Sequence, residues 1–529
     1  MAIDYAQPYP SQRSPVLARN VVCASQPLAA QAGLRTLWLG GNAADAAVAA
    51  AIASTVVEPT GNGLGSDAFA IVWDGTQLHG LNASGRAPAQ WTPDRFVGMQ
   101  AMSRRGWDSV TVPGAVSSWV ELNHRFGKLP FEKLFEPALD YARRGFAVSP
   151  IIAALWERIA PNYADQPGFA DAFLPGGRAP AAGEVFRNLP LADSLEKIAV
   201  TQGKALYQGE LGEALVRHAA QHGGAMTMDD LASHRVEWCG TLSQRFAGIE
   251  AHEIPPNTQG IATLIALGIL ERLNLGRYAV DSVDAMHLQI EAMKLAFADV
   301  EAFVGDPESM SIAPTELLSD AYLDSRAALI DLHRAGDFGA GAPRQGGTVY
   351  LTAADEAGMM VSFIQSNYEG FGSGIVVPGT GISLQNRGMG FSLQAGHPNQ
   401  VGPRRRPLHT IIPGFVLRAG QPAMSFGVMG GPMQAQGHVQ LIVRTQLFGQ
   451  NPQAASDAPR WQVVSGREVL VEAAMPESVV EGLQARGHVV RKQAPQAAFA
   501  FGGAQIIVRE RQGYVAGSDH RKDGAAVGF

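Results

Sequence analysis

Cysteine is nearly absent from this sequence, and its two cysteines, Cys23 and Cys239, lie far apart in the chain. A disulfide framework or a cysteine-based metal site needs several cysteines at short, characteristic spacings. We therefore expect both residues to be small apolar members of a core, without a disulfide between them.

Charge and long apolar runs are also scarce. Charged residues make up 17% of the chain, the formal net charge is -7, and the basic run Arg404–Arg406 is short, which argues against nucleic acid as a partner. The apolar stretch Ala43–Val57 is interrupted by Asp45 and is too short to span a bilayer. The first residues offer neither a basic nor an apolar signal region, so the sequence predicts a cytoplasmic protein without a membrane partner.

Several common catalytic signatures are missing. The chain has no His-Glu-x-x-His, no paired Cys-x-x-Cys, no Gly-x-Ser-x-Gly and no dinucleotide fingerprint opening a strand-helix unit. Its glycine-rich loop, Glu58–Asp67, is not followed by the Lys-Ser/Thr pair of a phosphate-binding loop. We therefore expect neither a metal nor a cofactor.

What is present is typical of a large globular protein. The 529 residues are 46% hydrophobic and include 60 glycines and 32 prolines, which indicates many turns and either two halves or one large two-part fold. Hydrophobic periodicity predicts helices over Pro27–Leu39, Ala43–Val57 and Asp284–Phe303, with Asn42 capping the second. From about 115 to 300 we expect mostly helix.

The later part of the chain reads as strands. A hairpin is predicted over Thr348–Ala354 and Met359–Ile364, a second strand pair over Ile411–Arg418 and Ala423–Gly427, and a last hairpin near 505–516. A helix is expected over about 434–448. Helices early and strands late predict an α+β fold with sheets between helix layers.

One residue with a hydroxyl group, Thr348, lies at a position that suggests a catalytic role. Gly346 and Gly347 precede Thr348 at the start of a predicted strand, after a connector rich in small residues at Phe338–Pro343 that would tolerate cleavage. If the peptide bond before Thr348 were cut, this residue would carry a nucleophilic hydroxyl and its own α-amine base. Composition alone favours the plainer alternative, a Gly-Gly turn leading into an edge strand.

A set of short motifs distributed along nearly the whole chain bears on this choice. In order and spacing these motifs resemble the γ-glutamyltransferases, and together they identify the chain as a member of that family. The matching segments are Gly40–Ala49, Val112–Gly114, Gly347–Thr348, Gly370–Gly374 and Gly430–Gly431.

The resemblance implies an N-terminal-nucleophile hydrolase with a four-layer αββα fold, made as a precursor that cuts itself before Thr348. Residues 1–347 would form a large subunit and residues 348–529 a small one, and the processed units could pair into a dimer. Thr348 would attack the amide carbonyl of a small-molecule substrate to give an acyl-enzyme, which water or an acceptor amine resolves. Its α-amine, with a reference pKa of roughly 7.7 to 8.0, would act as the base.

The same resemblance assigns further site residues. Gly430 and Gly431 would form the oxyanion hole, because glycine lets backbone N–H groups approach a developing charge closely. Asn367 would lie near the nucleophile. Arg86 would grip the substrate carboxylate, a task that suits a planar bidentate donor. Taken alone, Arg86 reads as a surface arginine and the glycine pair as a plain turn.

The sequence also departs from the family pattern. Members that act on glutathione carry Met-Asp-Asp-Phe, whose second acid holds the substrate α-ammonium group, whereas this chain has Gly388–Phe391 with Gly390 in place of that acid. The paired serines of the same pocket correspond to His409 and Thr410, and His409 either donates to the substrate or simply packs. The Thr-x-Asn support corresponds to Gln365–Asn367, with a register uncertain by one residue.

An arginine without a partner acid fits a substrate that carries a carboxylate and an amide but no α-amine. We therefore predict a self-processing amidohydrolase that resembles the oxamate amidohydrolase branch of the family. Two alternatives remain open at this point. One is a γ-glutamyl hydrolase or transferase that recognises the α-amine through other groups, and the other is an uncut, non-catalytic binding protein on the same fold.

Overall fold

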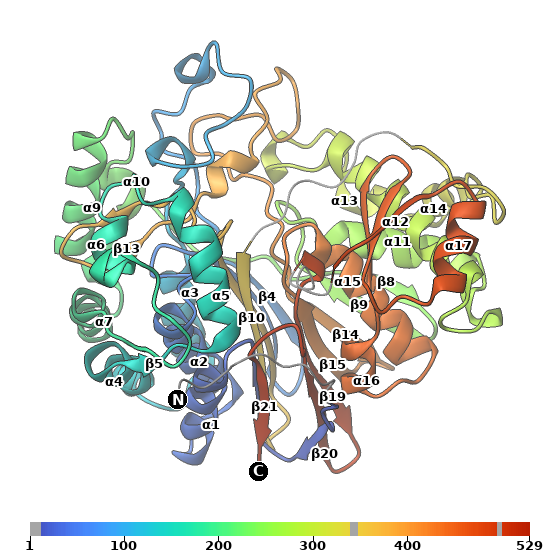
Figure 1. Ribbon diagram of the computed structural model, residues 1–529, viewed down its shortest axis with the longest axis horizontal. Helices are drawn as coiled ribbons and strands as arrows, with labels where there is room; N and C mark the ends of the chain where they lie inside the picture. Colours follow the sequence, from blue (N-terminus) through green and yellow to red (C-terminus); the bar gives the residue numbers. More distant parts are fainter. Residues whose placement is uncertain (1–11, 339–346, 495–499) are drawn as a thin grey trace.

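The computed structural model describes residues 12–338, 347–494 and 500–529 and shows two β-sheets packed face to face between two layers of helices (Figure 1). This is the four-layer αββα arrangement expected from the sequence. The connector segment 339–346, on which tolerance to cleavage was predicted, lies outside the described residues. No helix of the described segments is long and apolar enough to cross a membrane.

The first sheet, called sheet I, has seven strands in the order β21-β2-β10-β11-β3-β4-β7. All of its pairings are antiparallel. Its strands are β2 (Val21–Ala24), β3 (Asp67–Trp73), β4 (Leu78–Asn82), β7 (Glu237–Trp238), β10 (Gly347–Ala354), β11 (Met360–Tyr368) and β21 (Ala525–Gly528).

The second sheet, called sheet II, also has seven strands, in the order β1-β20-β19-β15-β14-β9-β8. Its pairings are antiparallel as well. Its strands are β1 (Val16–Ala18), β8 (Leu242–Phe246), β9 (Ile249–Glu253), β14 (Gly414–Arg418), β15 (Gln421–Val428), β19 (Ala504–Glu510) and β20 (Gly513–Ser518).

One helix layer covers the outer face of sheet I. At its centre α2 packs on β10 and β11, and all of its residues are buried because most are alanine or other small side chains. Asn42 and Asp45 cap its start reciprocally, as the sequence predicted for Asn42. The main helices of this layer are α1 (Pro27–Trp38), α2 (Ala43–Val57), α3 (Ala115–Phe126), α4 (Glu136–Arg144), α5 (Pro150–Ile159), α7 (Leu189–Thr201) and α9 (Glu210–Gln221).

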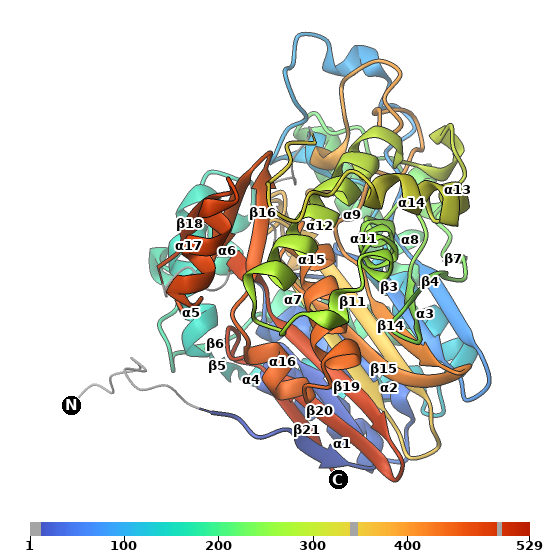
Figure 2. The same cartoon turned by 90° about the vertical axis from the view of Figure 1, so that its right-hand side faces the viewer.

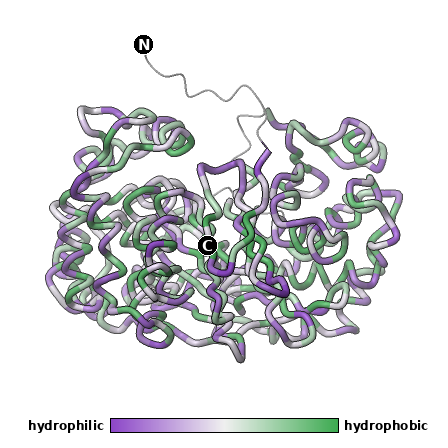
Figure 3. Tube along the Cα trace, turned by 90° about the horizontal axis from the view of Figure 1, so that it is seen from below, coloured by the Kyte–Doolittle hydropathy of each residue, from purple (hydrophilic) through white to green (hydrophobic). Residues whose placement is uncertain are grey.

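The other helix layer covers sheet II, and Figure 2 shows it from its outer side, in front of β14, β15 and β19. Helix α11 packs on β8 and β9, and α15 packs on β15. Viewed from below, the two helix groups flank the central strands (Figure 3). The main helices here are α11 (Gly260–Arg272), α12 (Val283–Phe303), α14 (Asp320–Ala327), α15 (Met433–Ile442), α16 (Pro452–Asp457) and α17 (Glu477–Ala485).

Side chains alternate strictly between the two faces of sheet I. On β10, Tyr350 and Ala354 belong to the apolar cluster between the sheets, whereas Leu351 and Ala353 pack under the helices. Because successive residues of a strand point to opposite faces, the even-numbered residues of β10 face sheet II. This parity places the side chain of Thr348 between the sheets.

Most predicted elements are confirmed, and residues 115–300 are mostly helical as expected, but the sequence did not predict β8 and β9 within this stretch. Strands β8 and β9 form a hairpin there, joined by Ala247 and Gly248, both at positive φ. Two-residue hairpin turns of this kind are usually recognised in a sequence by Asn-Gly or Asp-Gly, and Ala-Gly is not such a signal. Cys23 is buried, Cys239 is half-buried, and both are free.

Candidate active site

Thr348 lies at the start of β10 in the interior of sheet I, since β10 pairs with β2 on one side and β11 on the other. It therefore does not begin an edge strand, which was the plainer alternative. A register shift between Gly347 and Val349 interrupts the ladder at this point, and Gly347 pairs with Tyr368. The Thr348 side chain is almost fully buried in the continuous chain, with 2% of the residue exposed.

Two polar side chains contact the Thr348 hydroxyl. Its Oγ1 lies 3.1 Å from Ser366 Oγ and accepts a long hydrogen bond of 3.5 Å from Gln434 Nε2. The backbone N–H of Ile412 donates to Gln434 Oε1 at 3.0 Å, which turns the carboxamide so that its NH₂ group faces Thr348. A hydroxyl and a carboxamide are not bases near neutral pH, so proton abstraction requires another group.

The position of Asn367 follows from the same strand parity. On β11, Ser366 shares the inter-sheet face with Thr348, and Asn367 points to the opposite face. The Asn367 carboxamide accepts from Ser66 Oγ at 2.9 Å and donates to Ser383 Oγ at 3.3 Å. Ser366 is thus the direct contact of the predicted nucleophile, and Asn367 holds the loop beside it. Sequence reasoning came within one residue of this assignment.

The glycine-rich loop 58–67 packs directly against the nucleophile. The amide of Asn367 donates to Gly61 O at 3.0 Å, and a Cβ added to Gly61 would lie only 3.3 Å from Thr348 O. A Cβ on Gly63 would approach Ser383 Oγ to 2.0 Å. Gly61 therefore lets the backbone approach Thr348 closely and Gly63 lets it approach Ser383, roles that the sequence pattern alone did not reveal.

Gly430 and Gly431 form the turn between β15 and α15. Both have positive φ, 115° and 63°, and Gly431 O accepts from Gln259 Nε2 at 3.0 Å. Within the described chain, neither of their amide N–H groups donates a hydrogen bond. The turn leads into α15, whose Gln434 reaches Thr348, so the positive end of this helix lies near the predicted nucleophile.

Asp67 occupies the next position across sheet I, directly opposite Ser366 in the ladder between β3 and β11. The carboxyl group is fully buried, and burial raises its pKa to about 7, although the N–H of Gly85 donates to Oδ1 at 2.9 Å. Asp67 was not singled out by sequence reasoning, because a single acid at a strand start carries no pattern.

His409 packs above Asp67. Its Nε2 lies 3.4 Å from Asp67 Oδ2, and its ring meets the Phe69 ring edge to face at 5.1 Å. Neither ring nitrogen makes a hydrogen bond of good geometry within the described chain. Burial, together with the positive charges of Arg387 and Arg406, holds the pKa of His409 well below its usual value, so the ring is neutral at pH 7.

Thr410 connects this group to an arginine that sequence reasoning missed. Thr410 Oγ1 accepts from Arg387 Nη1 at 3.0 Å, and the Arg387 guanidinium stacks 4.0 Å from the centre of the Tyr368 ring. Tyr368 itself follows Ser366, whose Oγ accepts from the Tyr368 amide at 2.7 Å. The only available signal for Arg387 was its position immediately before the Gly388–Phe391 run.

Arg86 has a different environment. Its side chain is 35% exposed and its Nη2 donates to Glu237 Oε1 at 3.3 Å. Its Nη1 donates to Arg404 O at 3.0 Å and lies 3.7 Å from Asp306 Oδ2. The structure therefore engages Arg86 with two acids and does not bring it into contact with Thr348.

One described trio could supply metal ligands: His287, Glu291 and His488, whose ligand atoms lie within 4.8 Å of one another. The Lys294 ammonium already occupies this cluster, donating to Glu291 Oε1 at 2.7 Å and lying 3.4 Å from His488 Nδ1. A cation is thus supplied by the chain itself, and the trio does not suit a metal ion.

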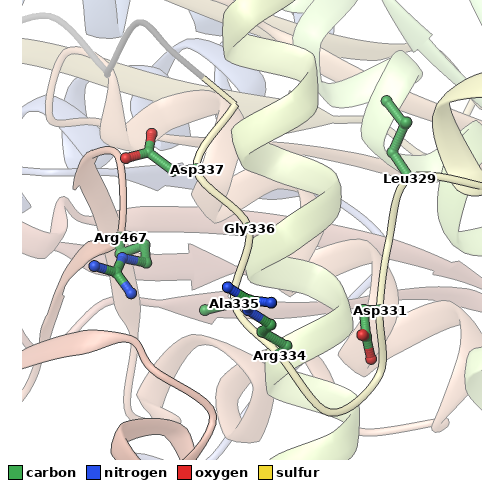
Figure 4. Close-up of a pocket in the computed structure, with 7 residues that line it drawn as sticks. All are labelled: Leu329, Asp331, Arg334, Ala335, Gly336, Asp337 and Arg467. Carbon is green, nitrogen blue, oxygen red and sulfur yellow. The ribbon is translucent and has the colours of Figure 1, made fainter.

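A hollow of about 440 Å³ opens beside that cluster (Figure 4). It contains none of the predicted catalytic residues. One of its walls, Gly336, is held to α12, since its N–H donates to Glu291 Oε2 at 2.7 Å and its carbonyl accepts from Lys294 at 3.1 Å. The residues lining it are Leu329, Asp331, Arg334, Ala335, Gly336, Asp337 and Arg467.

Comparisons with known proteins show which family this chain resembles. The γ-glutamyltranspeptidase family model matches residues 29–529. The chain is 36% identical over 527 residues to the glutathione hydrolase-like YwrD proenzyme of Bacillus subtilis, covering 98% of this chain and 100% of that one. It is 34% identical over 530 residues to the oxamate amidohydrolase proenzyme of Klebsiella pneumoniae, covering 98% and 99%.

Among solved structures, the cephalosporin acylase from Bacillus halodurans superposes with a TM-score of 0.95 at 46% identity, covering 100% of this chain and 99% of that one. The family model and these relatives span almost the whole chain, and the shared fold is that of N-terminal-nucleophile hydrolases. The protein is thus an enzyme of the amidohydrolase type, and its chain belongs to the γ-glutamyltranspeptidase family.

Proposed function

We propose that this protein is a self-processing N-terminal-threonine amidohydrolase that acts on a small carboxylate-bearing amide, oxamate or a close analogue, through an acyl-enzyme. The observation that carries the proposal is the Thr348 hydroxyl at the first turn of β10. It contacts Ser366 and Gln434, and Gln434 belongs to the helix that begins just after the Gly430–Gly431 turn.

Processing would begin with attack of Thr348 Oγ1 on the carbonyl carbon of Gly347. The resulting ester bond is then hydrolysed, and the products are residues 1–347 and 348–529. The new α-amine of Thr348 lies on the same residue as the hydroxyl. Because the described contacts of Oγ1 include no carboxylate or imidazole, this amine is the group best placed to take the hydroxyl proton.

Turnover would repeat the same chemistry on a substrate. Thr348 Oγ1 adds to the amide carbonyl, and the negative charge that develops on the carbonyl oxygen is stabilised by the Gly430 and Gly431 amides. Collapse of the tetrahedral intermediate expels the amine, which takes a proton from the α-ammonium group of Thr348. Water then attacks the acyl-enzyme and releases the acid.

The proposed substrate is supported by the residue at position 390, where members of the family that act on glutathione carry an acid. Gly390 has no side chain to hold an α-ammonium group, and His409 is neutral. The similarity to an oxamate amidohydrolase proenzyme points the same way. Relatives described as glutathione hydrolases support the alternative, a γ-glutamyl hydrolase or transferase, and the acylase relative supports a bulkier amide.

Intact-mass measurement tests processing. We expect the wild-type chain of 56.0 kDa to convert into two fragments divided before Thr348, and Thr348→Ala to stay whole under the same incubation. Full-length wild-type protein after long incubation would reject the mechanism. Cleavage at another bond would reject Thr348 as the nucleophile.

Substrate choice is tested with the processed protein on three amides: oxamate, a γ-glutamyl anilide and a cephalosporin amide. We expect kcat/KM to be highest for oxamate, with Thr348→Ala inactive on all three. A far higher kcat/KM for the anilide would favour the γ-glutamyl alternative, and a far higher value for the cephalosporin amide would favour an acylase.

A further inference from the structure

The Arg387 guanidinium is completely buried, yet only one of its nitrogens has a hydrogen-bond partner among the described residues. Nη1 donates to Thr410 Oγ1 at 3.0 Å, whereas Nε and Nη2 donate to nothing in the described chain. Buried charged groups are normally paired and fully hydrogen-bonded, because an unmet donor in the interior is costly. Two unmet donors on one buried arginine therefore indicate a missing acceptor.

The unmet donors share one edge of the guanidinium. Nε and Nη2 carry the two parallel N–H groups that bind both oxygens of a carboxylate side by side. The opposite edge is held in place by Thr410, and one face is covered by the Tyr368 ring at 4.0 Å. The group is thus fixed in orientation with its bidentate edge unoccupied.

Arg387 is linked to the predicted nucleophile through Tyr368. Tyr368 pairs with Gly347 in the β10–β11 ladder, and its amide donates at 2.7 Å to the Ser366 hydroxyl that contacts Thr348. Tyr368 has a φ of 79°, which is unusual for a side chain other than glycine and turns the chain at this point. Arg387 thus stacks on Tyr368, two residues after the Ser366 that contacts Thr348.

The neighbouring acids do not supply the missing acceptor. Glu369 is held by both Arg104 nitrogens, with distances of 2.8 Å and 3.1 Å. Asp67 accepts from Gly85, and burial raises its pKa to about 7, so it carries only part of a charge near neutral pH. By contrast, Arg86 already has acidic partners.

We propose that Arg387 is the receptor for the substrate carboxylate and that its Nε and Nη2 bind the two carboxylate oxygens. This inference rests on the proposed function and makes it more specific. It assigns carboxylate recognition to Arg387 rather than to Arg86, and it selects short acids whose carboxylate lies close to the scissile amide. Selectivity for a carboxylate over a neutral group then follows from one buried positive charge.

The first test is independent of turnover and uses oxalate, a dianion of the same size as oxamate. We expect millimolar oxalate to raise the Tm of the wild-type protein by several degrees and to leave the Tm of Arg387→Lys unchanged, since an ammonium cannot offer two parallel N–H groups. Arg387→Gln, a neutral variant, should also show no shift. Arg104→Lys, which alters a nearby paired arginine, should keep the shift. A wild-type protein that oxalate fails to stabilise, or an Arg387→Lys protein stabilised as strongly, would overturn the assignment.

The second test separates recognition from folding. Each variant is first checked by mass for complete self-cleavage, and oxamate is then compared with its uncharged counterpart oxamide. We expect Arg387→Lys to raise KM for oxamate at least tenfold and to change kcat/KM for oxamide less than twofold. Equal losses on both substrates would mean that Arg387 only supports the fold. Oxalate protection in a wild-type protein that hydrolyses no small carboxylate-bearing amide would reject the proposed function while leaving the Arg387 site in place.

Discussion

Removal of the Ser366 hydroxyl should slow self-cleavage while leaving the protein folded. Ser366 Oγ is one of two described side-chain contacts of Thr348 Oγ1, at 3.1 Å, and it also accepts from the Tyr368 amide at 2.7 Å. Ser366→Ala removes both interactions at a fully buried position. Among the described residues, Thr348 Oγ1 would then keep only the long hydrogen bond from Gln434.

The two losses have different magnitudes. A neutral hydrogen bond contributes a net of about 0.5 to 1.5 kcal/mol, so loss of nucleophile orientation should slow cleavage about threefold to tenfold. The Tyr368 amide would be left unpaired in the interior, which costs roughly 1 to 3 kcal/mol of unfolding free energy. A domain of this size tolerates that cost and should remain folded.

A matched control lies on the same face of the same strand. Ser362 is also fully buried, and its Oγ contacts Tyr350 Oη at 2.8 Å and Phe426 O at 3.3 Å, but not Thr348. Ser362→Ala should lose comparable stability in denaturant unfolding and cleave at the wild-type rate. Cleavage would be followed by intact mass over time. If Ser366→Ala cleaves as fast as wild type, or if both variants slow equally, the assignment of Ser366 to the nucleophile is incorrect.

Three further outcomes follow from the same geometry. Burial raises the pKa of Asp67 from 3.8 to about 7, so between about pH 4 and pH 7 the folded state holds a proton that the unfolded chain has released. This group therefore makes the free energy of unfolding fall as pH rises through that window. Tm measured across pH 5 to 8 should fall less steeply in Asp67→Asn, and an unchanged slope would contradict the assignment. Gly390→Asp should shift relative kcat/KM toward γ-glutamyl donors, with Leu408 moving slightly because a Cβ would lie 3.1 Å from its carbonyl oxygen; no shift would mean that the pocket is built differently. Gly63→Ala should slow self-cleavage strongly, because its Cβ would approach Ser383 Oγ to 2.0 Å and displace the loop that packs on Thr348. A normal cleavage time course would refute this role.

Local patterns in the sequence predicted the elements that carry the site. Helix α2 could be predicted because its small residues follow an Asn cap. The β10–β11 hairpin could be predicted because β-branched and aromatic residues flank a clear turn. The resemblance of five short motifs added the fold and the position of the cut. The β8–β9 hairpin was not readable, because its Ala-Gly turn resembles an ordinary helical dipeptide.

The contacts of the nucleophile were only partly readable. Which of Ser366 and Asn367 faces Thr348 depends on the register between β10 and β11, which shifts beside Gly347. A shift of one residue exchanges the two faces of a strand, and no local pattern reports it. Gln434 was equally hidden, since it reaches Thr348 from the start of α15, 86 residues further along the chain.

The sequence alone determined that Thr348 follows two glycines at the start of a strand, that no acid stands at Gly390, and that the chain carries the motifs of one enzyme family. These are properties of neighbouring residues, and their spacing suffices to state them. Only the tertiary structure decided that Ser366 contacts Thr348 and that the buried Arg387, unlike Arg86, keeps two side-chain nitrogens without an acceptor among the described residues. Both outcomes depend on strand register and on burial, which bring together residues that are distant in the chain and leave specific donors unpaired.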